Sequence, residues 1–187
     1  MKTPLIYMML AATCLVTGLS TGCSGESRGS QKAAPVQLGS TGAVEHPAAW
    51  SIEPLAGPVS AGKTATVRVT AKIQDGWHVY SLTQPAGGPK ATRIVVPGGQ
   101  PFIPAGEPAP TIQPEVKYDS AFRMNVQEHE NAITFDVPVR ATRRVAAPGD
   151  SIRIEVRYQV CDASLCYPQQ TTRLAAAVTD GTGAAGE

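Results

Sequence analysis

The sequence has no excess of charge of either sign, because 16 lysines and arginines nearly balance 15 aspartates and glutamates. Proteins that bind nucleic acid usually concentrate positive charge on one face of the domain. The balanced charge gives no indication of such a face. We therefore expect no nucleic-acid partner.

Aromatic residues make up only 5% of the chain, whereas it contains 16 prolines and 18 glycines. After residue 30 no stretch combines an amphipathic helical period with helix caps, which argues against a helical domain. Abundant proline and glycine are typical of β-domains with many turns. The length left after an export signal and a stem suits one domain.

Several segments alternate apolar and polar residues in the period of a β-strand. Residues 64–73 and 77–82 flank the turn signal Asp75-Gly76 and predict a hairpin, and further strands are expected at 92–96, 132–139, 151–160 and 171–178. Short strands between Pro/Gly turns favour an all-β, Ig-like antiparallel β-sandwich over residues 47–179. The proline-dense region 84–118 interrupts this pattern and is expected to hold a covering loop.

Long apolar runs are absent except at residues 5–19, which follow a short charged start. This run is too short for a stable membrane span and indicates a secretory signal peptide over residues 1–22. Residues 19–23 resemble a bacterial lipobox ending in Cys23, so we expect Cys23 to be lipidated. Residues 23–46 then form a flexible tether, 180–187 a disordered tail, and the lipid is the one link to the membrane.

Cysteine is also scarce, with four in the chain. Cys14 lies in the signal and Cys23 is the expected lipid site, which leaves Cys161 and Cys166 for the folded domain. In an oxidising compartment two such cysteines are expected to pair. Cys161 ends a predicted strand and four residues separate it from Cys166. Facing positions across an antiparallel pair can lie about 4.5 Å apart, within the range that a disulfide accepts.

A disulfide that closes a loop of about six residues stabilises a fold by only about 2 kcal/mol, and exposed disulfides in short turns are often the exchangeable ones. The spacing matches no zinc or haem motif, so no metal or cofactor is expected. The thioredoxin arrangement Cys-x-x-Cys is absent too, which favours a carrier over a self-activated oxidoreductase. Two alternatives remain open: an inert disulfide in an Ig-like envelope lipoprotein that binds another protein, and copper binding by Cys161, Cys166 and a nearby histidine or Met124.

Two separate motifs carry a resemblance: Val-Arg-Tyr-Gln-Val-Cys-Asp-Ala-Ser-Leu-Cys-Tyr-Pro at 156–168 and Asp-Gly-Trp-His-Val-Tyr-Ser at 75–81. Together they resemble the N-terminal periplasmic domain of DsbD-type thiol:disulfide interchange proteins. The resemblance implies an Ig-like sandwich in which Cys166 forms the mixed disulfide with a partner and Cys161 resolves it. It also implies a set of supporting residues around the pair: Tyr80, Gln159, Tyr167, Tyr118 in a cap segment 115–118, and His78, where the family often has an aromatic residue.

The resemblance further implies partners and a location in the periplasm. The pair would exchange electrons with thioredoxin-like periplasmic proteins of disulfide isomerisation or cytochrome maturation, as a protein-disulfide reductase does. Nothing after Cys166 could span a membrane, so we expect the electron donor to be a separate membrane thiol reductase. Shielding of the cysteines by an aromatic ring would fall to Tyr118 or Phe122. From its own chemistry, His78 would tune a thiolate if it lay beside Cys166.

Overall fold

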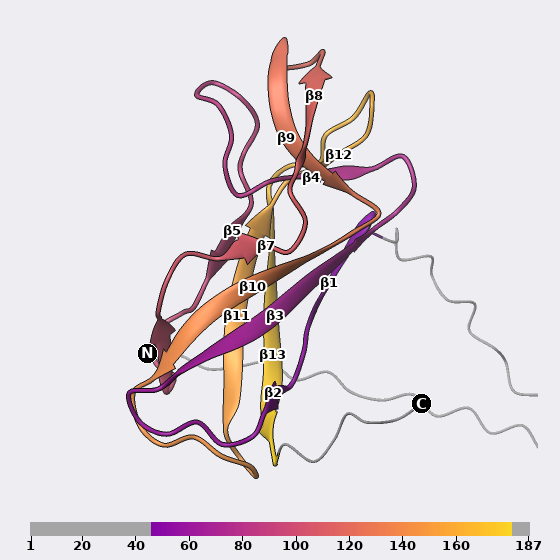
Figure 1. The fold of residues 1–187 in the computed structure, drawn as a ribbon. Coiled ribbons are helices and arrows are strands. Elements are labelled where there is room, and N and C mark those ends of the chain that lie inside the picture. The colour runs from indigo at the N-terminus through magenta and orange to yellow at the C-terminus, as the bar shows by residue number, and fades with distance from the viewer. Residues whose placement is uncertain (1–45, 181–187) are drawn as a thin grey trace, which may run out of the picture. The chain divides into compact units, whose positions relative to one another are not determined.

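The computed structural model describes residues 46–180, which form three β-sheets and no helix long and apolar enough to cross a membrane. Two sheets pack face to face and the third lies at one end of them (Figure 1). The predicted signal peptide, the tether before His46 and the tail after Asp180 lie outside the described residues. The predictions made for them stay predictions.

The first sheet is built on the two longest alternating segments of the sequence, β3 (Thr64–Ile73) and β10 (Ala132–Ala141), which pair antiparallel. β1 (Ala48–Ile52) lies on the other edge of β3, and β6 (Phe102–Pro104) and β7 (Ala109–Pro110) pair with β10. Alternate residues of β3 and β10 are buried, as expected for strands with one face on a core.

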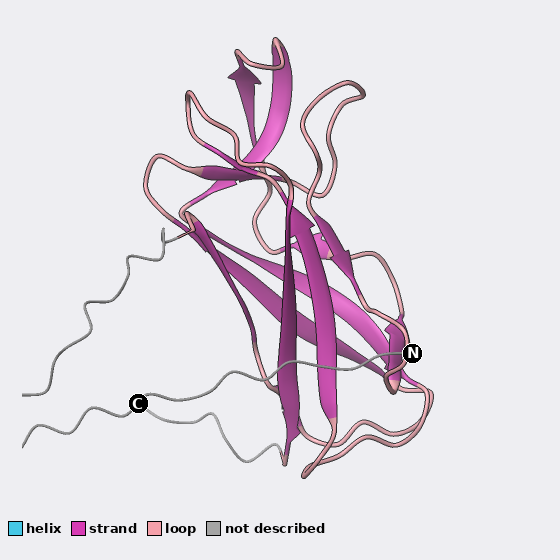
Figure 2. Cartoon of the chain, turned by 180° about the vertical axis from the view of Figure 1, so that it is seen from behind, coloured by secondary structure: helices cyan, strands magenta, loops and turns pink. Residues whose placement is uncertain are grey.

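The second sheet contains β11 (Ser151–Tyr158) and β13 (Gln170–Thr179) as an antiparallel pair, with β5 (Arg93–Val95) along β11 and β2 (Leu55–Ala56) parallel to β13. Seen from behind, β11 and β13 lie side by side and cross the strands of the first sheet at an angle (Figure 2). This arrangement is a β-sandwich.

The inward residues of both sheets form one hydrophobic core. The fully buried side chains come from both layers and include Val67, Val69, Phe135, Ile152 and Ile154. Burying a side chain of this size contributes about 1.5–3 kcal/mol to stability, so the alternating pattern supplies most of the driving force for folding. The predicted all-β, Ig-like sandwich is confirmed.

The third sheet consists of β12 (Val160–Cys161), β4 (His78–Tyr80), β9 (Met124–Glu130) and β8 (Glu115–Asp119), in that order. β9 runs almost directly into β10, and Asn131 joins them with a φ of 61°. Asparagine tolerates this left-handed conformation better than most residues. One ribbon therefore leaves the third sheet and enters the sandwich (Figure 1).

The expected hairpin between residues 64–73 and 77–82 is wrong. β3 pairs with β1 and β10, whereas β4 pairs with β12 and β9. Over residues 69–72 both edges of β3 are already occupied, so no hydrogen-bonding edge remains there for β4. The turn at Asp75-Gly76 does exist, with the Trp77 amide donating to the Gln74 carbonyl at 3.0 Å, but it sends the chain into the third sheet.

The other predicted strands are confirmed with shifted ends. The segment 151–160 divides at Gln159 into β11 and β12, which belong to different sheets. The proline-dense region holds β6 and β7 in addition to the expected strand at β5, and its last residues form β8. The expected cap segment 115–118 is therefore a strand of the third sheet.

Candidate functional site

Cys161 and Cys166 form a disulfide at the end of the third sheet, with an S–S distance of 1.98 Å and a Cα–Cα distance of 4.1 Å. The two residues also face each other as an antiparallel bridge. The turn between them is fixed by Asp162, whose Oδ1 accepts hydrogen bonds from the amides of Ser164 and Leu165, both at 2.7 Å. These hydrogen bonds stabilise the carboxylate and so lower the pKa of Asp162, and the bond from the Ser164 amide has the largest effect.

The two sulfur atoms differ in accessibility. Cys161 is 1% exposed and packs with Tyr80 and Val126, whereas Cys166 is only partly buried. A partner thiol can therefore reach the disulfide at Cys166, and Cys161 is the sulfur that stays inside.

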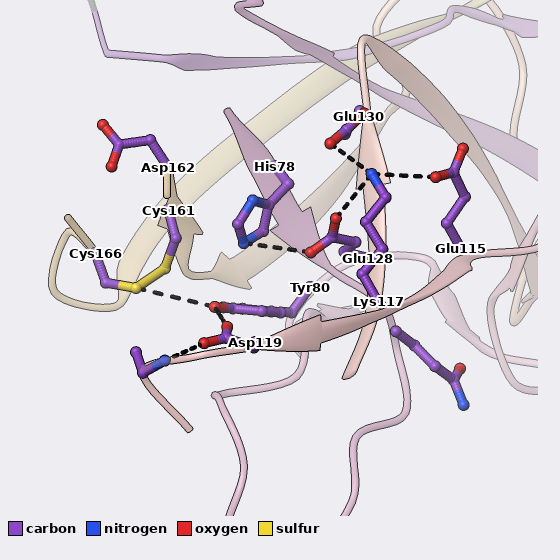
Figure 3. Close-up of polar contacts among 12 residues, drawn as sticks. His78, Tyr80, Glu115, Lys117, Asp119, Glu128, Glu130, Cys161, Asp162 and Cys166 are labelled. Carbon is purple, nitrogen blue, oxygen red and sulfur yellow. Dashed lines mark hydrogen bonds and ion pairs between the residues drawn. A yellow bond between two sulfur atoms is a disulfide. The ribbon is translucent and has the colours of Figure 1, made fainter. Parts of the chain in front are cut away.

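Tyr80 lies under the disulfide as a fully buried aromatic residue. Its hydroxyl donates to Asp119 Oδ2 at 2.8 Å, and its oxygen lies 3.9 Å from Cys166 Sγ (Figure 3). Burial raises the pKa of Tyr80, and the hydrogen bond to Asp119 and the charges of Asp119 and Glu128 raise it further. The phenol therefore stays protonated at neutral pH.

A short turn after β8 brings an aromatic ring to the pair. Asp119 Oδ1 accepts hydrogen bonds from the amides of Ala121 and Phe122 at 2.8 and 3.2 Å, so its two oxygens join Tyr80 to this turn. The Phe122 ring meets the Tyr80 ring edge to face, with centroids 6.2 Å apart. Phe122 and Met124 both pack against the cluster that contains Cys161. Of the two rings considered for shielding, Phe122 is the one at the disulfide.

His78 lies beside the disulfide because β4 pairs with β12, which places His78 opposite Cys161. Its Nε2 is 3.5 Å from Oε2 of Glu128, whose side chain is 6% exposed. The other oxygen of Glu128 is 3.1 Å from Lys117 Nζ, and that ammonium group is also 2.7 Å from Glu130 and 3.1 Å from Glu115. The hydrogen bond to Glu130, and those to the other two carboxylates, raise the pKa of Lys117.

Two other predicted residues, Gln159 and Tyr167, lie next to the cysteine turn but outside the groove described next. Gln159 Nε2 donates to the Tyr167 carbonyl at 3.3 Å, and its Oε1 accepts from the Lys90 amide at 3.3 Å. The Tyr167 ring packs near Trp77 and His46, with centroid distances of 5.5 Å to each. Both residues fix the segment around Cys166.

A groove of about 490 Å³ opens over Cys166. Its rim carries two exposed hydrophobic side chains, Tyr118 at 67% and Leu165 at 52% exposure. It is lined from three sides by β4, by the β8–β9 arm and by the cysteine turn: Gly76, His78, Lys117–Phe122, Glu128, Glu130 and Asp162–Cys166. The disulfide is thus accessible from a concave surface with an apolar rim.

The structure brings Cys161, Cys166, Tyr80 and His78 together and places Tyr118 at the rim. Sequence reasoning missed Asp119, Glu128 and Lys117, because their positions depend on how β8 and β9 pair. Asp119 alone had a local signal, since an aspartate before a short polar stretch often caps a turn. Among residues 46–180, no group of three or more histidine, cysteine, aspartate or glutamate side chains could hold a metal ion.

Comparisons with protein families and with solved structures both find N-terminal domains, of DsbD or of ScsB. A family model described as "Thiol:disulfide interchange protein DsbD, N-terminal" matches residues 53–177, more than half of the chain. Among curated protein sequences no relative matches the chain.

Two solved structures are similar. The N-terminal periplasmic domain of ScsB from Proteus mirabilis shares 12% identity and a TM-score of 0.50, covering 72% of this chain and 47% of that one. The reduced N-terminal domain of DsbD from Neisseria meningitidis shares 19% identity and a TM-score of 0.42, covering 64% of this chain and 78% of that one. The chain spans about half of the ScsB structure, and that likeness supports the fold alone.

Proposed function

The chain belongs to the family of DsbD N-terminal domains of thiol:disulfide interchange proteins, and on this premise we propose that Cys161 and Cys166 carry electron pairs between partner proteins. The observation that carries the proposal is a disulfide with one sulfur in a groove and the other buried. Such a pair can alternate between dithiol and disulfide, and each cycle moves two electrons and two protons.

The roles of the two cysteines follow from their accessibility. In the reduced chain, the Cys166 thiolate attacks a partner disulfide, forms a mixed disulfide and releases the first partner thiolate. Cys161 then attacks Cys166 Sγ, which breaks the mixed disulfide, releases the second partner thiolate and closes the Cys161–Cys166 bond. Reduction of the oxidised chain runs these steps in reverse, starting with a thiolate that attacks Cys166.

Tyr80 and Asp119 are proposed to support Cys166. Because the Tyr80 hydroxyl hydrogen is given to Asp119, the phenol oxygen near the sulfur can accept a hydrogen bond from a Cys166 thiol. The same phenol can turn its hydrogen toward a thiolate, which stabilises the charged form. The site thus offers Cys166 a partner in both protonation states.

The proposed partners and location extend the family premise. We place the domain in the periplasm, anchored through a lipid on Cys23, with a separate membrane thiol reductase as electron donor. The acceptors would be thioredoxin-like proteins of disulfide isomerisation or cytochrome maturation. The groove over Cys166, with Leu165 and Tyr118 on its rim, is a suitable docking surface for such a partner.

The decisive experiment is the equilibrium potential of the pair, poised against dithiol buffers, together with the rate of exchange with a reduced thioredoxin-like protein. A potential in the range of exchange proteins with rapid transfer would support the proposal. Structural disulfides lie below about −300 mV and exchange slowly. A value in that range, with a bond that resists exchange in the folded chain, would leave an Ig-like binding protein with an inert disulfide.

Single-cysteine variants test the two roles separately. The partner is a thioredoxin-like protein with a single active-site cysteine, activated as a mixed disulfide with thionitrobenzoate. Cys161→Ser should accumulate a mixed disulfide with it through Cys166, because neither protein then holds a second thiol to resolve the bond. Cys166→Ser is the matched control and should accumulate little, because Cys161 is 1% exposed. Equal trapping by both variants would contradict the assignment.

A further inference from the structure

The reaction leaves one proton unaccounted for. When Cys161 resolves the mixed disulfide it must react as a thiolate, so its proton has to move first. Burial disfavours the charged form of a thiol, and Cys161 is too buried for bulk water to accept the proton directly. A neighbouring side chain is needed.

Tyr80 does not suit this task, since burial and Asp119 raise the pKa of its phenol and keep it protonated. His78 does suit it. It is the residue that β4 places directly opposite Cys161. Side chains of directly opposite residues lie on one face of the sheet with Cβ atoms about 4.5–5.5 Å apart. The His78 ring also packs against the Tyr80 ring, at a centroid distance of 5.1 Å, and so stands on the same side as the sulfur atoms (Figure 3).

The charged groups around His78 are mostly carboxylates. Glu128 and Glu130 face it from β9, Lys117 and Asp119 from β8, and Asp162 from the cysteine turn, so negative groups outnumber the one ammonium. Glu128 is the group in contact, and Lys117 fixes its other oxygen. An imidazolium formed here gains a carboxylate partner at once.

In the oxidised chain His78 and Glu128 are close to each other but not hydrogen-bonded. Nε2 of His78 is buried without a hydrogen-bond partner among residues 46–180, although the carboxylate oxygen is 3.5 Å away. At this distance the ring makes only a loose contact with the carboxylate. A small movement that accompanies proton uptake can close it into a charge-assisted hydrogen bond.

We propose that His78, positioned by Glu128, accepts the proton of the Cys161 thiol when Cys161 resolves the mixed disulfide at Cys166. The proposal rests on the function proposed above. The Cys161 S–H bond breaks, the proton passes to the imidazole, and the sulfur electron pair forms the new bond to Cys166 Sγ. The bond between Cys166 and the partner sulfur breaks, and the imidazolium returns its proton to the departing thiolate or to water in the groove.

The test uses the thiols of Cys161 and Cys166 and a small aromatic disulfide, 5,5′-dithiobis(2-nitrobenzoate), as the probe. Cys14 and Cys23 are replaced by serine in every chain compared, so that no other thiol reacts. Reduced full-length chain in mild detergent is mixed with one equivalent in a stopped-flow instrument between pH 5 and 9. Attack by Cys166 releases the first thionitrobenzoate in a bimolecular phase. Resolution by Cys161 releases the second in a unimolecular phase, and only this phase depends on the proposed proton transfer.

In the wild-type chain the rate of the second phase should change little with pH around neutrality, because the group that accepts the proton is part of the site. A positioned base contributes about 10²–10⁴-fold in typical enzymes. We expect His78→Phe to slow the second phase at pH 7 by about 10–100-fold, toward the low end of this range. Its pH profile should then rise only near the thiol value of about 8.5. The first phase should stay unchanged, which also reports that the variant is folded.

Glu128→Gln should slow the second phase by a smaller factor, and the double variant should be no slower than His78→Phe, because Glu128 acts through His78. His46→Phe is the matched control and should leave both phases unchanged, since His46 packs against Tyr158 and Tyr167. If His78→Phe fails to fold, His78→Gln replaces it, with the same expectation.

A second phase in His78→Phe with the rate and pH profile of wild type would overturn the proposal. The outcome is separable from the proposed function, because the probe reaction needs no protein partner. A wild-type chain with both phases but without exchange with thioredoxin-like proteins would overturn the proposed function alone. A wild-type chain that releases one equivalent only would overturn both.

Discussion

At the scale of single residues, Asp119 links parts of the site that are distant in sequence. One oxygen holds the Tyr80 hydroxyl and the other holds the turn that carries Phe122. A single carboxylate thus connects the phenol beneath the disulfide with the ring beside it.

We predict that Asp119→Ala destabilises the oxidised chain by about 1–3 kcal/mol, because it leaves the buried Tyr80 hydroxyl without its acceptor. Urea unfolding followed by tryptophan fluorescence measures this change. In the control, Tyr80→Phe combined with Asp119→Ala should cost less than the sum of the two single variants. Full additivity would show that the two side chains are not coupled.

The residues of the site were predictable to different degrees. Cys161, Cys166 and Tyr80 stood out because motif spacing and strand alternation are local properties of the sequence. Glu128 and Lys117 did not, because their meeting depends on the register of β8 against β9. Register is decided by tertiary packing and turn geometry, neither of which a single sequence displays.

At the scale of elements, the β8–β9 arm covers one side of the disulfide. Its turn places Phe122 against Tyr80 and the cysteine cluster, whereas Tyr118 on the preceding strand points to solvent. The arm therefore offers a direct comparison between a covering ring, Phe122, and an exposed ring, Tyr118, which are four positions apart in sequence.

Removing the covering ring should make the disulfide easier to reach. An edge-to-face aromatic pair contributes about 0.5–1.5 kcal/mol, so Phe122→Ala should raise the rate of reduction by dithiothreitol by about 2–10-fold. The rate is measured under pseudo-first-order conditions. Tyr118→Ala is the matched control and should reduce at the wild-type rate, and equal rates for all three chains would mean that the ring does not limit access.

The positions of the long strands could be predicted from the sequence, but the pairing of the strands could not. Alternation located β3, β10, β11 and β13 closely, because each buries one face on the sandwich core. Alternation says nothing about which edge a strand pairs with. The short strand β4 was therefore assigned to its neighbour in sequence, although both edges of β3 were already taken.

At the scale of the whole molecule, the buried His129 should make the stability of the fold depend on pH. His129 packs edge to face on Phe135 of the core, and its Nε2 lies 3.2 Å from the Ser81 hydroxyl. Burial lowers the pKa of His129 below its ordinary value. The folded chain therefore keeps this ring neutral at pH values where the unfolded chain protonates it.

The sign of the effect on stability follows directly. Above about pH 6.5 the ring is neutral in both states and contributes nothing to the pH dependence. Below that value the unfolded chain binds an extra proton, so the free energy of unfolding should fall as the pH decreases, by up to about 1.4 kcal/mol per pH unit. Urea unfolding between pH 5 and 7 tests this. His129→Gln should flatten the slope and His46→Gln should not.

The cysteine turn has a consequence for repeated use of the domain. Cys161 and Cys166 are five positions apart and are already neighbours across an antiparallel bridge, with Cα atoms 4.1 Å apart. Opening the bond releases only a short, hydrogen-bonded turn and leaves both sandwich sheets closed. Amide hydrogen exchange in the sandwich should therefore be the same in the two redox states. Since proteolysis also requires local opening of the fold, the reduced and oxidised domains should be equally resistant to proteases in the cell.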